Sequence, residues 1–163
     1  MCLLILMLSL NSLHTLESIT VVDGVADLSH VDFKTTESIP LSGDWEFYWD
    51  QLLQSSDFQK KEIFDKKTAK VPGAWSVGEN GGIPSQGVAT YHLMIVYPKT
   101  LKDPAIRIQN VSTAYKVYAN GQLLADVGNI TKKASDFINE EKLSILALPS
   151  NAETIELIIQ VGN

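Results

Sequence analysis

The sequence predicts an all-β fold, a sandwich or a barrel with at most one short helix, and three observations support this class. Residues 90–97 alternate between two faces with the period of a strand. Residues 114–119 alternate again and lead directly into Asn120-Gly121, a pair that favours a type I′ turn, so residues 122–127 are expected to pair back. Similar short segments recur with turn signals between them, which is typical of sandwiches and barrels.

The N-terminal part contains two predicted strand regions. Residues 19–28 hold two short strand-like pieces on either side of Asp23-Gly24. In residues 44–50, an aromatic face alternates with a mostly acidic one, which predicts a half-buried strand. The aromatic face consists of Trp45, Phe47 and Trp49, and the other face of Asp44, Glu46, Tyr48 and Asp50.

Residues 51–89 break this alternation. Ser55 or Ser56 is expected to cap a short helix that begins near Asp57. Residues 68–71 are expected to form a short strand that ends at Pro72-Gly73. The glycine-rich stretch that follows predicts a long surface loop.

The C-terminal part adds three more predicted strands, at residues 105–109, 143–148 and 153–161, which brings the total to about eight or nine. The period-2 patterns predict that two sheets pack together with one apolar face of each strand inward. The residues expected to point inward are Trp45, Phe47, Tyr91, Ile95, Val117, Leu157 and Ile159.

Composition excludes several classes of partner and cofactor. A chain of 163 residues is long enough for one domain with a substantial core. Its net charge is −6 and its only arginine is Arg107, so it should repel nucleic acid. Cys2 is the only cysteine, which excludes an internal disulfide and a thiolate metal cluster. No cofactor and no metal are expected.

The first ten residues, MCLLILMLSL, are apolar enough for the central region of a signal peptide and too short to span a bilayer. A basic segment before them and a clear cleavage site after them are missing. We therefore expect residues 1–18 to be a truncated signal peptide, with an N-terminal strand as the alternative. Residues 19–163 are expected to form the β-sandwich.

Catalytic motifs are absent from the sequence, and the chain is expected not to be an enzyme. His14, His30 and His92 do not have metal-ligand spacing, and His92 is expected to be a surface or packing residue because a lone imidazole lacks partners. Asp44, Glu46 and Asp50 lie at separations that glycosidase carboxylate pairs use, but a solvated acidic face explains them without chemistry.

Taken together, five segments resemble two related families: LSGDWEFYW, VPGAWS, GVATYHLMI, IRIQNVSTAYKVYANGQLLADVG and IELIIQVGN. Their order is similar to the N-terminal sugar-binding jelly roll of glycoside hydrolase family 2. It resembles more closely the extracellular sensor domain of bacterial seven-transmembrane receptors with diverse intracellular signalling modules. The resemblance covers residues 22–163.

This resemblance implies a two-sheet antiparallel jelly-roll sandwich, similar to galactose-binding domains, outside the cytoplasmic membrane (periplasmic or at the cell surface). It also implies a longer parent protein with membrane and cytoplasmic signalling domains, so the C-terminal end is expected to be incomplete. The implied function is the sensing of a carbohydrate or another small polar ligand. The alternatives are a structural or protein-interaction sandwich and an accessory sugar-binding domain of a glycosidase.

The predicted ligand site is the loop of residues 73–89, because ligands of jelly rolls commonly bind where loops gather. Trp75 offers a flat face for a sugar ring, and Glu79, Asn80 and Gln86 offer hydrogen bonds. Tyr91 and Asn120 extend the site if their strand ends lie nearby. The competing interpretation is that Trp75 plugs the end of the sandwich and nothing binds there.

Overall fold

The computed structural model describes residues 19–36, 38–60, 64–74, 83–84, 86–98, 101–108, 114–131, 144–150 and 152–162. Among them are β1 (Thr20–Val21), β2 (Val25–Asp27), β3 (Ser42–Trp49), α1 (Ser55–Phe58), β4 (Lys66–Val71), β5 (Val88–Val96), β6 (Ala105–Ile108), β7 (Ala114–Ala119), β8 (Gln122–Val127), β9 (Ser144–Ala147) and β10 (Thr154–Gly162). In this part of the chain, no helix has the length and apolar character needed to cross a membrane.

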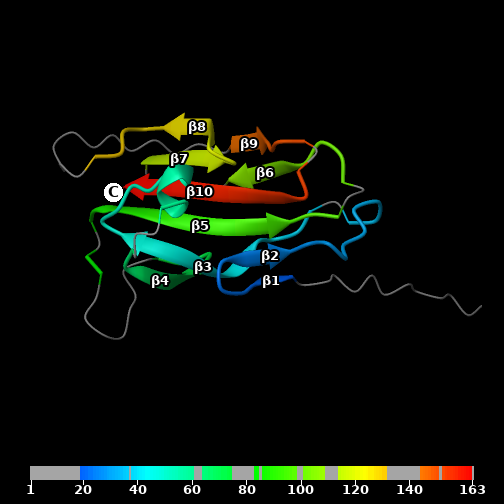
Figure 1. Cartoon of the computed structure of the whole chain (residues 1–163), viewed down its shortest axis with the longest axis horizontal. Coiled ribbons are helices and arrows are strands. Elements are labelled where there is room, and N and C mark those ends of the chain that lie inside the picture. Colours follow the sequence, from blue (N-terminus) through cyan, green and yellow to red (C-terminus); the bar gives the residue numbers. More distant parts are fainter. Residues whose placement is uncertain are drawn as a thin grey trace, which may run out of the picture.

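The strands form two sheets, which confirms the predicted all-β sandwich (Figure 1). The large sheet has eight strands: β1, β3, β5, β10, β7 and β8 follow one another, β4 pairs with β3, and β2 pairs with β5. β6 and β9 form a small antiparallel sheet. One detail differs from the expected antiparallel arrangement, since β1 and β2 pair in parallel with β3 and β5.

The core lies on one face of the large sheet, where alternate residues of β3, β5, β7 and β10 are apolar. Ile106 and Ile108 of the small sheet belong to the same buried cluster, so the two sheets pack on each other. All seven residues predicted to point inward lie in or against this core: Trp45, Phe47, Tyr91, Ile95, Val117, Leu157 and Ile159. Period-2 alternation therefore predicted the buried face correctly.

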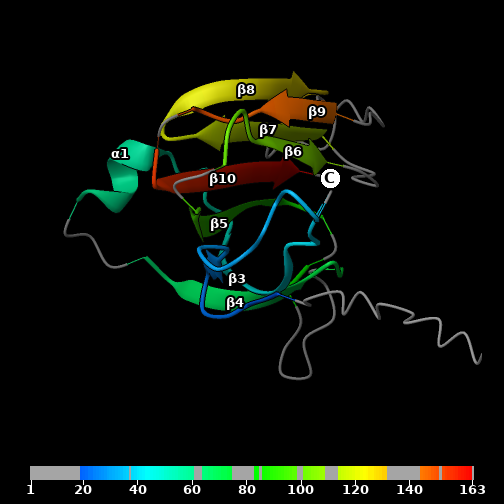
Figure 2. The same ribbon diagram turned by 90° about the vertical axis from the view of Figure 1, so that its right-hand side faces the viewer.

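The opposite face of the large sheet, here called the outer face, is also partly covered. Thr90 and Gln160 lie on it, and both are buried. The Thr90 hydroxyl donates to the Gln51 carbonyl and accepts from the Leu53 amide, and the Gln160 amide donates to the Leu53 carbonyl. The segment that contains α1 thus crosses the outer face, on the side away from β6 and β9 (Figure 2).

α1 begins earlier than predicted, with Gln54 rather than Ser55 or Ser56 at its N-cap. The Gln54 amide donates to the Asp57 carboxylate at 3.0 Å, which satisfies a backbone donor that the first turn leaves free. Asp57 was expected near the helix start and instead lies in the middle of its single turn. The short helix is fixed by its contacts with the sheet, since one turn is too short to be stable alone.

The β7–β8 hairpin has the predicted Asn-Gly turn. Asn120 and Gly121 have φ angles of 48° and 78°, as a type I′ turn requires. The Asn120 side chain accepts from the Glu156 amide at 2.8 Å, and the Asn120 amide donates to the Glu156 carbonyl at 2.9 Å. The turn is therefore tied to β10 as well as closing its own hairpin.

Replacing Gly121 by valine should destabilise the protein by about 1 kcal/mol or more, because a β-branched residue resists a positive φ. Urea unfolding measures this loss. Leu123→Val, in the exposed part of the same hairpin, is the control and should change stability by less than about 0.5 kcal/mol. Equal effects of the two substitutions would contradict the turn assignment.

Candidate functional site

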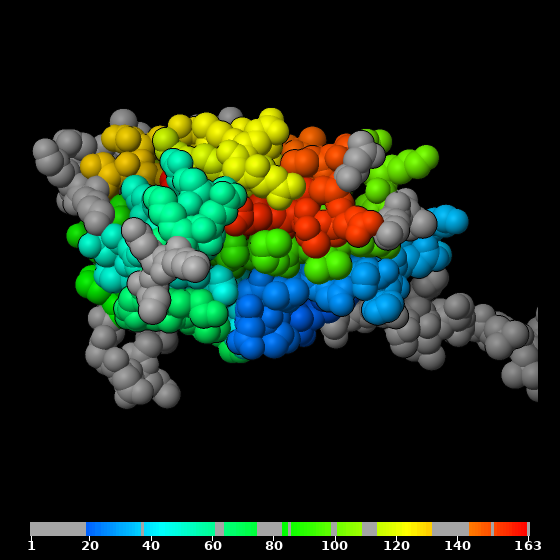
Figure 3. Space-filling view, viewed as in Figure 1, coloured from blue at the N-terminus to red at the C-terminus, as the bar shows by residue number. Residues whose placement is uncertain are grey.

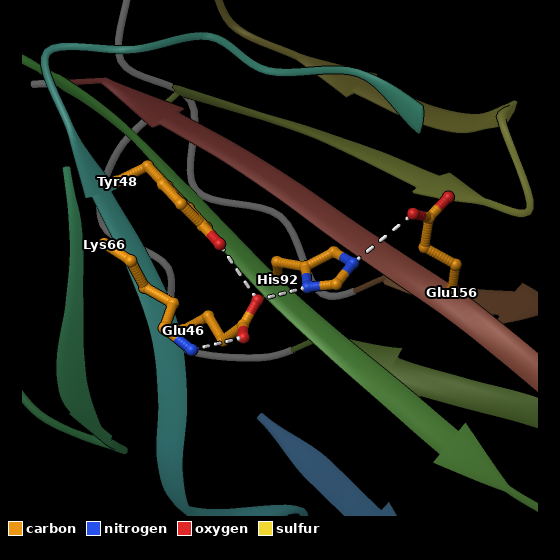
Figure 4. Close-up of polar contacts among 5 residues, drawn as sticks. All are labelled: Glu46, Tyr48, Lys66, His92 and Glu156. Carbon is orange, nitrogen blue, oxygen red and sulfur yellow. Dashed lines mark hydrogen bonds and ion pairs between the residues drawn. The ribbon is translucent and has the colours of Figure 1, made fainter. Parts of the chain in front are cut away.

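Three neighbouring strands bring ionisable side chains together on the outer face. Strand register places Glu46 of β3 directly opposite His92 of β5, and Glu156 of β10 lies diagonally across from the same histidine. His92 Nδ1 is 2.7 Å from Glu46 Oε2, and its Nε2 is 3.3 Å from Glu156 Oε1 (Figure 4). The imidazole therefore bridges two carboxylates.

Glu46 has two further partners. The Tyr48 hydroxyl donates to Oε2 at 3.0 Å, and the Lys66 ammonium donates to Oε1 at 3.0 Å. Both carboxylate oxygens of Glu46 are thus occupied. We call Glu46, Tyr48, Lys66, His92 and Glu156 the histidine cluster; Figure 4 shows all five.

Aromatic rings from the segment that contains α1 and continues to Phe64, here called the covering segment, pack against this cluster. The Phe58 ring of α1 stacks on the His92 imidazole, with centroids 4.2 Å apart and planes 18° apart. Tyr48 makes edge contacts with Phe58 and with Phe64. The side chains of His92, Glu46 and Glu156 are only 10%, 18% and 19% exposed, so the ion pairs are largely shielded from water.

The surroundings shift the pKa values of two groups. Burial alone would raise the pKa of the Glu46 carboxyl, but hydrogen bonds from Lys66, His92 and Tyr48 outweigh it and hold that pKa below its ordinary value. Burial, together with the neighbouring Glu46 carboxylate, raises the pKa of Tyr48.

These contacts correct two sequence-based interpretations. His92 was expected to be a surface or packing residue because a lone imidazole lacks partners; it is buried and packs against Phe58, but two carboxylates also contact it. Glu46 was assigned to a solvated acidic face, yet it is mostly buried and hydrogen-bonded. The sequence did not reveal these contacts because they are long-range. Glu46 and His92 are 46 positions apart in the sequence, and His92 and Glu156 are 64 positions apart. The cluster anchors α1 to the sheet.

Lowering the pH should weaken this anchor. The folded-state pKa of Glu46 lies below the ordinary value of 4.5, so its stabilising contribution is fully present above pH 4.5 and is lost as the pH falls through the folded-state pKa. Urea unfolding between pH 7 and pH 3 should therefore show a decline below pH 4.5 that is shallower in Glu46→Gln. An equally steep loss of stability below pH 4.5 in the wild type and in Glu46→Gln would contradict this role of Glu46.

Among the described residues, no group of three histidine, cysteine or acidic side chains could hold a metal ion. The histidine cluster has two carboxylates and one imidazole, and these groups already contact one another and Lys66. Its chemistry is that of an internal ion network.

The structure separates the described members of the predicted loop site. Trp75, Glu79 and Asn80 lie outside the described residues. Gln86 is exposed, two residues before β5 begins. Asn120 is bonded to Glu156, which is level with Met94 of β5. At about 3.3 Å per residue, β5 alone puts about 20 Å between Val88, at the Gln86 end, and Met94, at the Asn120 end.

Tyr91 belongs to the core side of β5 and not to a loop surface. Its ring packs edge-on against Phe47 and Trp45, with centroids 5.0 and 6.4 Å away. Burial raises the pKa of Tyr91 to about 12. Tyr91, Gln86 and Asn120 are therefore not brought together, and the loop site as such stays a prediction.

A groove of about 300 Å³ lies elsewhere, on the outer face between α1 and the β7–β8 hairpin. We call it the outer groove. Figure 3 shows this face, with α1 in teal beside the hairpin in yellow. The residues that line it are Gln54, Ser55, Ser56, Gln59, Tyr118 and Gly121.

Sequence reasoning did not assign this groove. The one local signal was Tyr118, an aromatic residue on the more polar face of β7, immediately before the turn. The other lining side chains come from a segment about 60 residues earlier, and only the tertiary fold brings them to the hairpin.

The β-sandwich is similar in fold to a part of two solved β-glucuronidases. A β-glucuronidase from Faecalibacterium prausnitzii matches with a TM-score of 0.54 and 17% identity, over 75% of this chain and 20% of the enzyme. A β-glucuronidase from Ruminococcus gnavus, in complex with D-glucaro-d-lactam, matches with a TM-score of 0.55 and 14% identity, over 76% of this chain and 21% of the enzyme.

Sequence comparisons add nothing to this likeness: no family model matches the chain, and no curated protein matches it. The chain spans about a fifth of the length of the two enzymes. At this level of identity, the likeness shows a shared fold.

Proposed function

We propose that this chain is a non-catalytic carbohydrate-binding module of a longer protein. The observation that carries the proposal is the fold, which is shared with about a fifth of each β-glucuronidase. A β-sandwich that occurs within sugar-processing enzymes is a suitable scaffold for a site that recognises sugars. The outer groove adds a surface of uncharged polar groups and one aromatic ring.

The finer form of the proposal is a sensor domain of a membrane receptor, located outside the cytoplasm. Two sequence features support it: the segments that resemble such sensor domains, and the apolar stretch of residues 1–10. Fusing residues 1–30 to a reporter that is active only outside the cytoplasm tests the location. An active reporter is expected, and a reporter retained inside the cell would contradict it.

An accessory domain of a glycosidase is the second candidate, and the β-glucuronidase likeness favours it. Both candidates bind sugar without cleaving it. The two differ in what the parent protein carries, either membrane segments or a catalytic domain, and the full reading frame distinguishes them.

Isothermal titration calorimetry tests the shared claim. The purified chain is titrated with methyl β-D-galactoside, methyl β-D-glucoside, lactose, cellobiose and D-glucuronic acid. We expect heat of binding with at least one of them, and no release of p-nitrophenol from p-nitrophenyl β-D-glucuronide. Binding to none of the panel would favour a protein-interaction sandwich, and hydrolysis would contradict the non-catalytic assignment.

A further inference from the structure

The outer groove has the composition of a sugar site. Its lining side chains are two amides, two hydroxyls and one phenol, and none carries a charge. Amides and hydroxyls both donate and accept hydrogen bonds, as sugar hydroxyls do. In the part of the chain that the structure describes, Ser55, Ser56 and Tyr118 have no hydrogen-bond partner for their hydroxyls, so these groups are available to a ligand.

We propose that a neutral saccharide binds in the outer groove with one ring face stacked on Tyr118. This inference rests on the proposed carbohydrate-binding function and assigns its site. The Tyr118 ring supplies an apolar surface for the C–H side of the sugar, while its hydroxyl remains polar. A groove of about 300 Å³ is at the lower end of the usual range for ligand pockets, which fits a mono- or disaccharide.

Both walls of the groove are fixed before any ligand arrives. On the α1 side, Phe58 stacks on His92, and the Leu53 backbone bonds to Thr90 and Gln160. On the hairpin side, Asn120 makes two hydrogen bonds to Glu156. A preorganised site loses little conformational entropy on binding, which favours recognition of small ligands.

Gly121 keeps the floor of the groove open. A Cβ atom at this position would lie 3.5 Å from Ser55 Cβ, in van der Waals contact, so a side chain longer than that of alanine would extend into the space between the hairpin and α1. The positive φ of 78° independently favours glycine here. The turn that closes the hairpin thus also brings the backbone close to α1 without blocking the groove.

Charge favours a neutral sugar over an acidic one. The only arginine, Arg107, lies on β6 in the small sheet, away from the outer face. Lys60, the cation nearest in sequence to α1, is paired with Asp57 at 2.7 Å. Lys116, on the same face of β7 as Tyr118, is paired with Asp126 at 3.0 Å. With both of these described lysines paired to carboxylates and a net charge of −6, the charge of the protein disfavours a uronate.

The test uses calorimetry and the sugar panel above with matched variants. Tyr118→Ala should weaken binding about tenfold or more, because the stacking surface is lost. Tyr118→Phe keeps the ring and should stay within about threefold, and Gln59→Ala should lose about three- to tenfold. Gln86→Ala tests the alternative loop site: it should bind as the wild type does, and weaker binding would overturn the groove in favour of the loop of residues 73–89.

A second measurement uses the wild-type protein, so it does not depend on whether the variants fold. In ¹⁵N-edited NMR spectra, the tightest neutral saccharide should shift the Gly121 amide and the Gln59 side-chain amide more than the Gln86 side-chain amide. The reverse pattern would overturn the groove and favour the loop of residues 73–89.

The outcomes distinguish an error in the groove assignment from an error in the proposed carbohydrate-binding function. If the wild type binds a sugar and both Tyr118→Ala and Gln59→Ala bind it equally well, the groove assignment is wrong while the proposed function stands. If D-glucuronic acid binds more tightly than every neutral sugar, the assignment of a neutral ligand is wrong. If no sugar binds, the proposed function fails together with the groove.

Discussion

Replacing Phe47 by alanine should lower the free energy of unfolding by about 3–5 kcal/mol. Phe47 is only 1% exposed and lies in β3, which pairs with both β4 and β5. Its ring packs against Trp49 at 6.5 Å and against Tyr91 at 5.0 Å. Alanine would leave a cavity where three strands of the large sheet meet the core, and the rigid sheet can collapse only partly around it.

Urea unfolding of Phe47→Ala measures the effect, and a fall in melting temperature of about 6–20 °C should accompany it. Val22→Ala is the control, because Val22 is 59% exposed and its truncation should change stability by less than about 0.5 kcal/mol. A loss below about 1 kcal/mol for Phe47→Ala would contradict the position of the core.

The second large effect is expected for His92→Ala, at about 3 kcal/mol. Removing the imidazole leaves the Glu46 and Glu156 carboxylates partly buried, each short of one polar partner. It also removes the surface on which Phe58 stacks. Both the carboxylate contacts and the ring contact that are lost lie where α1 meets the sheet. We therefore expect α1 to detach from the outer face while the core of the sandwich remains folded.

Hydrogen exchange provides the specific readout for His92→Ala. Amides of the covering segment, such as Leu53, should exchange faster, whereas amides in the middle of β10 should change only with overall stability. Lys116→Ala is the control, because it breaks the more exposed Lys116–Asp126 pair and should cost at most about 1 kcal/mol. If the two substitutions had equal cost, the histidine cluster would be an ordinary surface ion pair.

The sequence predicted most strands because strand alternation is a local signal. Trp45 and Phe47, or Leu157 and Ile159, reveal their inward face without knowledge of their partners. The turn at Asn120-Gly121 was predictable for the same reason, since its backbone conformation depends on those two residues.

Features that depend on pairing were not predictable in the same way. Alternation on β5 placed Thr90 and His92 on the face opposite Tyr91 but contained no signal that another segment covers that face. The parallel contacts of β1 and β2 also depend on strands distant in sequence. Register, and not composition, brings Glu46, His92 and Glu156 together.

The candidate site shows the same difference between local sequence signals and features that depend on the tertiary fold. The loop of residues 73–89 was chosen for its length, its glycines and Trp75, all local properties. The outer groove depends on Gln59 and Tyr118 being neighbours, which only the fold establishes. Asn120 was selected correctly as part of a turn, but its side chain is bonded to Glu156.

The most direct test of the central claim is a crystal structure of this chain grown with its tightest-binding neutral saccharide. We expect sugar density in the outer groove, with one ring face against Tyr118 and hydroxyls within hydrogen-bond distance of Gln59 or Ser55. Sugar density in the loop of residues 73–89, with an empty groove, would contradict the account.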